Sequence, residues 1–161
     1  TGASNRSALS HILEALTRKA ETGNLPAPFA VLFMDLDKFK PLNDRWGHEN
    51  GDLALIEVVQ RIRGMLRSND MLARLGGDEF VVMLQGVETH EQASMVRDKI
   101  LEVMGTALTS LKGVPVHESV YLGASIGQAI YPTDGPDAQT LLKHADRDMY
   151  SQKARSQGGA L

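Results

Sequence analysis

The chain has 161 residues, enough for one domain with a buried core, and its 42% apolar and 23% charged residues are ordinary for a globular protein. It contains no cysteine, which excludes disulfides and thiolate metal sites and fits a reducing compartment. The net charge of −3, without a basic stripe, argues against broad nucleic-acid binding, and no apolar run approaches the roughly 18 residues that span a bilayer. Because the sequence starts at Thr1 rather than Met, we expect a segment of a longer protein.

The first half of the chain predicts three helices and one buried strand. Five apolar residues at helical spacing predict a first helix that ends near Gly23: Leu9, Ile12, Leu13, Leu16 and Ala20. The continuous apolar run FAVLFMDL, residues 29–36, is typical of a central strand buried on both faces. A short helix is predicted over 39–47 and a long one over 50–67. The long helix directs four apolar side chains toward the core: Leu55, Val59, Ile62 and Leu66.

A hairpin and a helix are predicted next. Residues 71–75 and 79–84 flank Gly76 and Gly77, and this pair favours a two-residue turn with positive φ at both centres. Thr89 and Gln92 then form a capping-box pattern. The helix behind it carries an apolar stripe: Val96, Ile100, Val103 and Ala107.

The last third of the chain predicts a strand and a closing helix. Residues 119–132 indicate a strand in which Gly123 and Gly127 mark bulges or close approaches of another segment. Pro136 is placed to start the closing helix, whose inward residues are Leu142, Ala145 and Met149. We expect the Ser- and Gly-rich tail after Arg155 to be frayed.

This order of elements predicts an α/β fold with a mixed, mainly antiparallel central sheet flanked by helices. Asp35 closes the first strand, and Asp78 and Glu79 follow the hairpin turn. If these strands are neighbours, the three acids converge at one edge of the sheet, where their oxygens suit a hard divalent cation such as Mg²⁺. The alternative is that Asp78 and Glu79 are solvated turn residues.

Five segments spread over the chain carry recognisable motifs: TGASNRSAL (1–9), MDLDKFKPLNDRWGHENGD (34–52), GGDEF (76–80), SIGQAIYP (125–132) and HADRDMYSQK (144–153). In this order they resemble the GGDEF domains, the diguanylate cyclases, which make cyclic di-GMP from two GTP. The resemblance implies a single GGDEF domain over residues 1–161, excised from a multidomain signalling protein. It also implies the nucleotidyl cyclase or polymerase-palm (ferredoxin-like) architecture.

The resemblance assigns the catalytic centre to the acids already singled out. It implies that Asp35 and Asp78 hold Mg²⁺ or Mn²⁺, with the backbone carbonyl of Leu36 as a further oxygen ligand. Glu79 completes the acidic cluster, and either Asp78 or Glu79 assists removal of the 3′-hydroxyl proton. Lys40 is the third implied catalytic residue, through contact with phosphate.

Substrate contacts are also implied. Asn43 and Asp52 resemble the pair that reads the guanine edge, although alone they also suit a turn residue and a helix cap. The backbone amides of Lys38, Phe39 and Lys40 are expected to cradle phosphates at a helix N-terminus.

The triphosphate is expected to meet the hairpin and the last helix. Gly76 and Gly77 lack a Cβ, so a triphosphate can approach them closely. Lys153 matches the family's phosphate-binding lysine. Four residues later the chain has Gln157 where the family usually has arginine, and this loss either raises the KM for GTP or is compensated by Arg155.

A second site is suggested by RSND, residues 67–70. Arg67 and Asp70 match the Arg-x-x-Asp motif at which many such cyclases bind their product, because arginine and aspartate both pair with guanine. Arg97, on the following helix, is a further expected contact. Without the resemblance, Arg67 and Asp70 also suit a helix end and a turn.

The resemblance therefore implies a cytoplasmic enzyme, whose parent protein is free to be membrane-anchored, with GTP as substrate and cyclic di-GMP as product and inhibitor. Catalysis requires a transient homodimer, because each domain holds one GTP. Neither nucleic acid nor membrane is an expected partner of this domain. The alternatives are a weak or silent GGDEF module that binds GTP or cyclic di-GMP as a regulatory domain, and a purely structural interaction domain.

Overall fold

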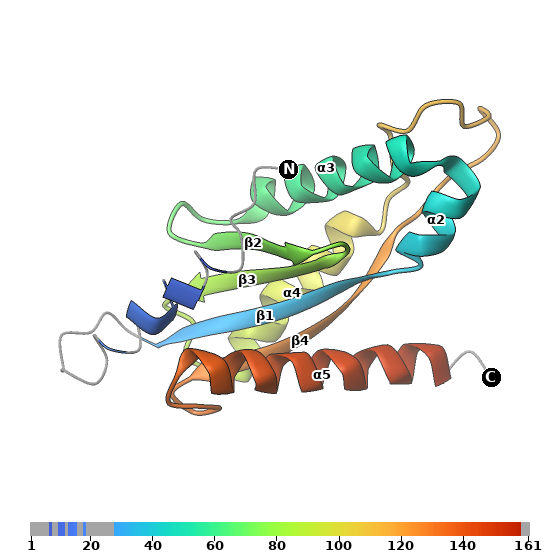
Figure 1. The fold of residues 1–161 in the computed structure, drawn as a ribbon. Helices are drawn as coiled ribbons and strands as arrows, with labels where there is room; N and C mark the ends of the chain where they lie inside the picture. The colour runs from blue at the N-terminus through green and yellow to red at the C-terminus, as the bar shows by residue number, and fades with distance from the viewer. Residues whose placement is uncertain (1–6, 8–9, 12, 16–17, 19–27, 159–161) are drawn as a thin grey trace.

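The computed structural model describes residues 7, 10, 11, 13–15, 18 and 28–158, with side chains up to residue 155 (Figure 1). Most of the predicted first helix, including Leu9, Ile12, Leu16 and Ala20, lies outside the described residues. Leu13 is helical and fully buried, as its place in the predicted stripe requires.

The described part of the chain forms one sheet of four strands. The strands are β1 (Phe29–Asp37), β2 (Met71–Gly76), β3 (Glu79–Gln85) and β4 (Gly123–Tyr131), in the order β2-β3-β1-β4. All three pairings are antiparallel, so the mainly antiparallel sheet is confirmed, and the parallel component implied by a mixed sheet is absent from the described strands. β1 is a central strand, as its continuous apolar run predicts.

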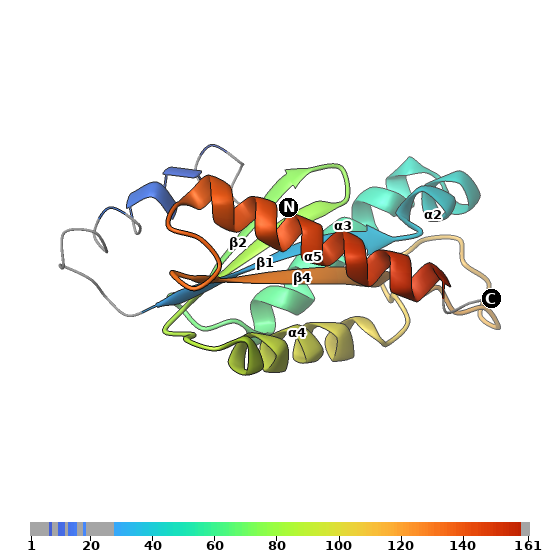
Figure 2. The same ribbon diagram turned by 90° about the horizontal axis from the view of Figure 1, so that it is seen from below.

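Helices cover both faces of the sheet (Figures 1 and 2). They are α2 (Phe39–Trp46), α3 (His48–Met65), α4 (His90–Met104) and α5 (Ala138–Gly158). Along β1, Leu32, Met34 and Leu36 pack in one core with α3 and α4, whereas Val31 and Phe33 pack in a second core with α5. This two-residue alternation follows the pleat of a strand, and it carries Asp35 and Asp37 to the α5 side of the sheet.

The hairpin differs from its prediction by one residue. Gly76 pairs with Glu79, so the two turn residues are Gly77 and Asp78 rather than Gly76 and Gly77. Only Gly77 has a positive φ, of 37°. The cause is an irregularity between Arg74 and Gly76, which inserts one extra residue into β2 and moves the turn forward. Asp78 thereby occupies the tip of the hairpin.

Other boundaries also differ from the predictions. The strand predicted from residue 119 begins at Gly123, and the helix predicted to include Ala107 ends at Met104. Residues 105–122 instead form a loop that α3 holds by polar contacts: Asn50 bonds to the backbone of Lys112, and Glu57 accepts the amides of Thr109 and Ser110. In this loop, hydrogen bonds to α3 side chains satisfy backbone groups that would otherwise pair with a neighbouring strand.

The closing helix is longer than expected and is closely packed on β4. It starts at Ala138, after Asp137 accepts the amide of Thr140, and it continues through the predicted frayed segment to Gly158. A Cβ on Gly127 would lie 2.0 Å from the backbone nitrogen of Met149, so this glycine allows the close approach of α5. Asp148 adds a hydrogen bond by accepting the Gln128 amide at 2.9 Å. Within the described part of the chain, no helix has both the length and the apolarity to cross a bilayer.

Candidate functional site

The end of β1 and the hairpin tip lie side by side, as the sequence interpretation requires (Figure 1). Asp35 is paired with Glu79 in the β1–β3 register, and the Leu36 amide donates to the Asp78 carbonyl oxygen at 3.0 Å. Paired residues of neighbouring strands direct their side chains to the same face of the sheet. The acids therefore meet on the side of the sheet that α5 covers.

The ionised form of Asp78 is electrostatically unfavourable in this position. Burial raises the pKa of Asp78 above its usual range, and the neighbouring Asp35 carboxylate raises it further. A like-charged pair of this kind is unfavourable unless a cation shares it. Acids whose pKa is raised in this way are concentrated at functional sites.

Lys153 of α5 supplies a cation in this structure. Its Nζ atom lies 2.5 Å from Asp35 Oδ2, and the two side chains are 28% and 14% exposed. The hydrogen bond to Asp35 raises the pKa of Lys153, and the charges of Asp35, Asp37 and Asp78 add to this effect. The predicted phosphate-binding lysine thus lies at the acidic centre.

Asp35 still has unused capacity to bind a cation. Its Oδ1 atom is buried and has no hydrogen-bond partner among the described residues. The Leu36 carbonyl accepts no backbone hydrogen bond from the Asp78 amide. Two carboxylates and a carbonyl suit Mg²⁺ or Mn²⁺ chemically. Among the described residues, no group of three or more acidic or histidine side chains is arranged to hold a metal ion, and the place of Glu79 in the acidic cluster stays a prediction.

The expected guanine-reading residues come from α2 and α3. Asn43 lies against Gly51, where an added Cβ would be 1.7 Å from Asn43 Oδ1. That oxygen is buried and unpaired among the described residues, which is costly without a ligand donor. Asp52 is exposed and lines a cavity of about 240 Å³ with Leu55, Ile56 and Arg74. Asn43 and Asp52 therefore both present free acceptor groups at the α2–α3 junction.

The turn between β1 and α2 has the features of a phosphate-binding corner. Lys38 has a left-handed backbone with φ 61° and ψ 29°, which is uncommon for a residue with a side chain. No acidic residue occupies the first turn of α2, so the positive end of the helix is not neutralised locally. Lys40 is exposed on this turn, and Phe39 packs partly against the core. Gly76 and Gly77 are exposed at the hairpin, with open space where a Cβ would lie.

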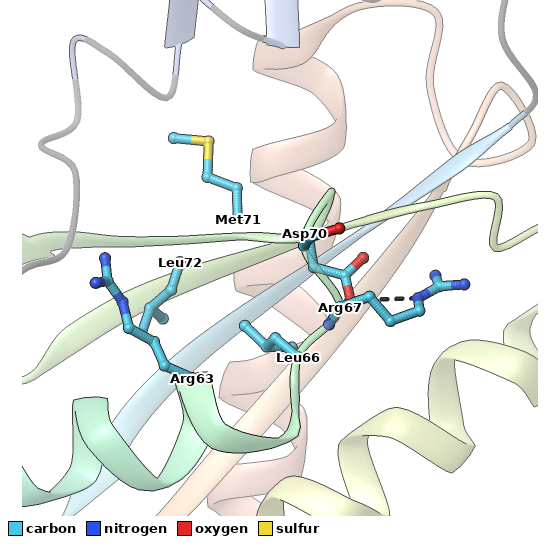
Figure 3. A pocket seen from close by; sticks show the side chains of 7 residues that line it. Arg63, Leu66, Arg67, Asp70, Met71 and Leu72 are labelled. Atoms are coloured by element: carbon cyan, nitrogen blue, oxygen red, sulfur yellow. Dashed lines mark hydrogen bonds and ion pairs between the residues drawn. The ribbon is translucent and has the colours of Figure 1, made fainter.

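The RSND segment forms a separate site between α3 and β2, shown close up in Figure 3. Asp70 Oδ2 accepts the Arg67 amide at 2.9 Å and lies 3.5 Å from Arg67 Nε. Asp70 Oδ1 is buried and has no described partner, whereas the Arg67 side chain is 61% exposed. A further arginine, Arg63, lines the same cavity of about 330 Å³. Arg67 and Asp70 are thus brought together, as expected.

Arg97 does not line the cavity of Arg67 and Asp70 in this structure, and its expected contact with product stays a prediction. It pairs with Asp98 and lines a different cavity, with Ser125 and Gln152. Lys99 instead lines the cavity on the α4 side of Arg67. Because successive helical residues rotate by about 100°, positions 97 and 99 occupy nearly opposite faces of α4.

Sequence reasoning missed two groups that form hydrogen bonds beside the candidate site. Ser125 of β4 donates to Asp37 at 2.8 Å, and Arg74 donates to the Gly77 carbonyl from both Nε and Nη2, at 3.1 and 2.8 Å. Asp35 and Asp37 are two residues apart in β1 and therefore lie on one face of the strand. No pattern in the sequence links either contact before the strand register is known. Gln157 lies in α5, and its side chain is outside the described part.

Comparison with known proteins gives a consistent result. The family model described as "Diguanylate cyclase, GGDEF domain" matches residues 1–158. The bifunctional diguanylate cyclase/cyclic di-GMP phosphodiesterase MucR of Pseudomonas aeruginosa is 44% identical over 131 residues, which are 81% of this chain and 18% of MucR. The chain therefore spans less than a fifth of that curated relative.

Solved structures agree in fold. The GGDEF domain of TpbB (YfiN) from Pseudomonas aeruginosa is similar with a TM-score of 0.86 and 37% identity, over 96% of this chain and 87% of that one. The GGDEF domain of DgcB from Caulobacter crescentus, solved in complex with c-di-GMP, has a TM-score of 0.80 and 27% identity, over 99% of this chain and 88% of that one. From the family match and these likenesses, the chain belongs to the GGDEF domain family of diguanylate cyclases.

Proposed function

We propose that this domain condenses two GTP molecules into cyclic di-GMP and two pyrophosphates. The observation that carries the proposal is the convergence of Asp35 and Asp78, with a buried Asp35 oxygen that has no described partner. Membership of the GGDEF family supports the same reaction class.

Guanine recognition would rest on Asn43 and Asp52. The unpaired Asn43 oxygen and the exposed Asp52 carboxylate are both acceptors, and guanine presents donors at N1 and N2. Adenine lacks this donor pair, so the wrong base would leave acceptors unpaired at a cost of about 1–3 kcal/mol each. The α2 amides, Lys40 and Lys153 would bind the triphosphate.

Asp35, Asp78 and the Leu36 carbonyl are the groups that would hold Mg²⁺ or Mn²⁺. When bound, such an ion polarises the α-phosphate and neutralises charge on the leaving pyrophosphate. The raised pKa of Asp78 and the orphan oxygen of Asp35 are the observations that fit this role.

Two domains related by a twofold axis would complete the ring. Each 3′-oxygen forms a bond to the α-phosphorus of the other GTP, and the bond from that phosphorus to the oxygen bridging to the β-phosphate breaks, releasing pyrophosphate. The hydroxyl proton passes to a nearby base, for which Asp78 and Glu79 are the candidates. Alignment of the two nucleotides would contribute much of the rate, since positioning is worth roughly 7–11 kcal/mol in favourable cases.

Product would bind at Arg67 and Asp70 and inhibit the enzyme. The exposed Arg67 guanidinium is suited to phosphate or guanine, and the orphan Asp70 oxygen is suited to a guanine N–H. Lys99 of α4 lines a neighbouring cavity that also borders Arg67, whereas Arg97 lines neither of these two cavities.

The reaction itself is tested by incubating the domain with GTP and Mg²⁺ and measuring cyclic di-GMP and pyrophosphate by chromatography. Asp78→Asn should lower turnover by roughly 100-fold or more, because it removes a charged ligand worth several kcal/mol in the transition state. It should not lower the melting temperature, since it also removes a like charge beside Asp35. Asp146→Asn, at an exposed position of α5, is the matched control.

Three outcomes distinguish the functions. Turnover that Asp78→Asn abolishes supports the cyclase. GTP binding without turnover at high protein concentration would favour a silent regulatory module. Absence of binding for both GTP and cyclic di-GMP would leave a structural interaction domain.

Guanine recognition is tested by Gly51→Ala. The new Cβ and the Asn43 oxygen cannot both occupy their present positions, so the Asn43 amide must turn away. Alanine is otherwise a better helix residue than glycine by about 1 kcal/mol, and we expect an unchanged or higher melting temperature. GTP affinity, measured by calorimetry, should fall about tenfold or more. Gly64→Ala, with open space at its Cβ in the same helix, should leave affinity unchanged, and equal affinity in both variants would refute the role of Asn43.

Product inhibition is tested with three single variants. Arg67→Ala should weaken cyclic di-GMP binding strongly and relieve inhibition without lowering the initial rate. Lys99→Ala should weaken binding to a smaller degree, whereas Arg97→Ala, on the opposite face of α4, should have no effect. An inhibition curve unchanged by Arg67→Ala, or one shifted by Arg97→Ala alone, would contradict this assignment.

A further inference from the structure

The contact between Lys153 and Asp35 has a consequence for cation binding. Lys153 lies 118 residues from Asp35 in the sequence, yet its ammonium bonds directly to one oxygen of the proposed metal ligand. Both side chains are mostly buried, at 28% and 14% exposed, so water screens the pair only partly. The ammonium therefore occupies part of the coordination capacity that a divalent cation would use.

The charges explain why this lysine lies there. Asp35, Asp37 and Asp78 are close enough to Lys153 for each to favour its protonated form. Without a cation, burial and the charge of Asp35 oppose ionisation of Asp78. A single ammonium offsets part of this repulsion, and the orphan Asp35 Oδ1 shows that it does not satisfy the whole site.

The packing of α5 fixes the lysine in position. One turn before Lys153, the backbone of Met149 lies against Gly127, and Asp148 accepts the Gln128 amide. These contacts hold α5 against β4 one turn before Lys153 (Figure 2). The Lys153 side chain, in contrast, has a flexible four-carbon stem. Its ammonium can therefore change partner without movement of the helix.

We propose that Lys153 is a displaceable counter-cation, which binds Asp35 in the nucleotide-free domain and must release it when a divalent cation binds. This inference rests on the proposed function, since it assumes that Asp35 is a metal ligand. The released ammonium then lies beside the site of the triphosphate, so cation binding and phosphate binding by Lys153 are linked.

The inference predicts opposite effects of one substitution on two ligands. Lys153→Met removes the competing ammonium, so Mn²⁺ alone should bind the nucleotide-free domain more tightly, on the order of fivefold, as measured by the loss of the free Mn²⁺ signal in electron paramagnetic resonance at pH 8. The same variant should bind GTP more weakly in calorimetry, because it loses a phosphate contact. Without metal, its melting temperature should fall by roughly 2–4 °C.

Lys143→Met is the matched control, because it removes the same charge from an exposed position of α5. It should change neither affinity. Mn²⁺ binding that is equal in wild type and Lys153→Met would overturn the inference while leaving the cation site intact, since a lysine that binds only phosphate would give that result. Failure of both proteins to bind Mn²⁺ without nucleotide would also overturn it, and the effect of Asp78→Asn on turnover would still decide the proposed function.

Discussion

The site depends on the register between β1 and β3. Asp35 stands opposite Glu79, and the Leu36 amide holds the Asp78 carbonyl, so the acid at the hairpin tip is fixed beside the acid at the end of the central strand. A slip of one residue would turn Asp35 to the opposite face of the sheet. The two apolar cores oppose that slip, because it would exchange the packed side chains of β1 between the two cores and carry Asp35 into the core formed with α3 and α4. Core packing thereby specifies the position of charged groups that contribute nothing to the core.

The same arrangement is electrostatically unfavourable without ligands. Asp78 is partly buried beside a like charge, Asp35 and Asn43 each have a buried oxygen with no described partner, and Lys38 has a left-handed backbone. Without ligands, each of these features lowers the free energy of unfolding of the domain. A cation near Asp35, a guanine near Asn43 and phosphates near the α2 turn would offset these costs. The three features lie around the same end of β1, and this clustering is the strongest physical argument for a nucleotide site.

Much of this could be predicted from the sequence, for identifiable reasons. The run from Phe29 to Leu36 has no polar residue before Asp35, so its central position and the location of the acid followed directly. The turn was predicted one residue early, because glycine pairs indicate a turn without revealing the irregularity after Arg74. Arg97 was assigned to the product site from approximate spacing, and in this structure it lines a different cavity, because a difference of two residues on a helix nearly reverses the face. The contact between Lys153 and Asp35 depends on how α5 packs on β4, which local sequence patterns do not specify.

A crystal structure of the domain with a non-hydrolysable GTP analogue and Mn²⁺ would test the central claim most directly, because the anomalous signal locates the ion. The account predicts a peak within about 2–2.5 Å of oxygens from both Asp35 and Asp78, with the analogue's triphosphate sharing the ion and its guanine at Asn43 and Asp52. An ion bound elsewhere, or a nucleotide bound without either carboxylate, would contradict it.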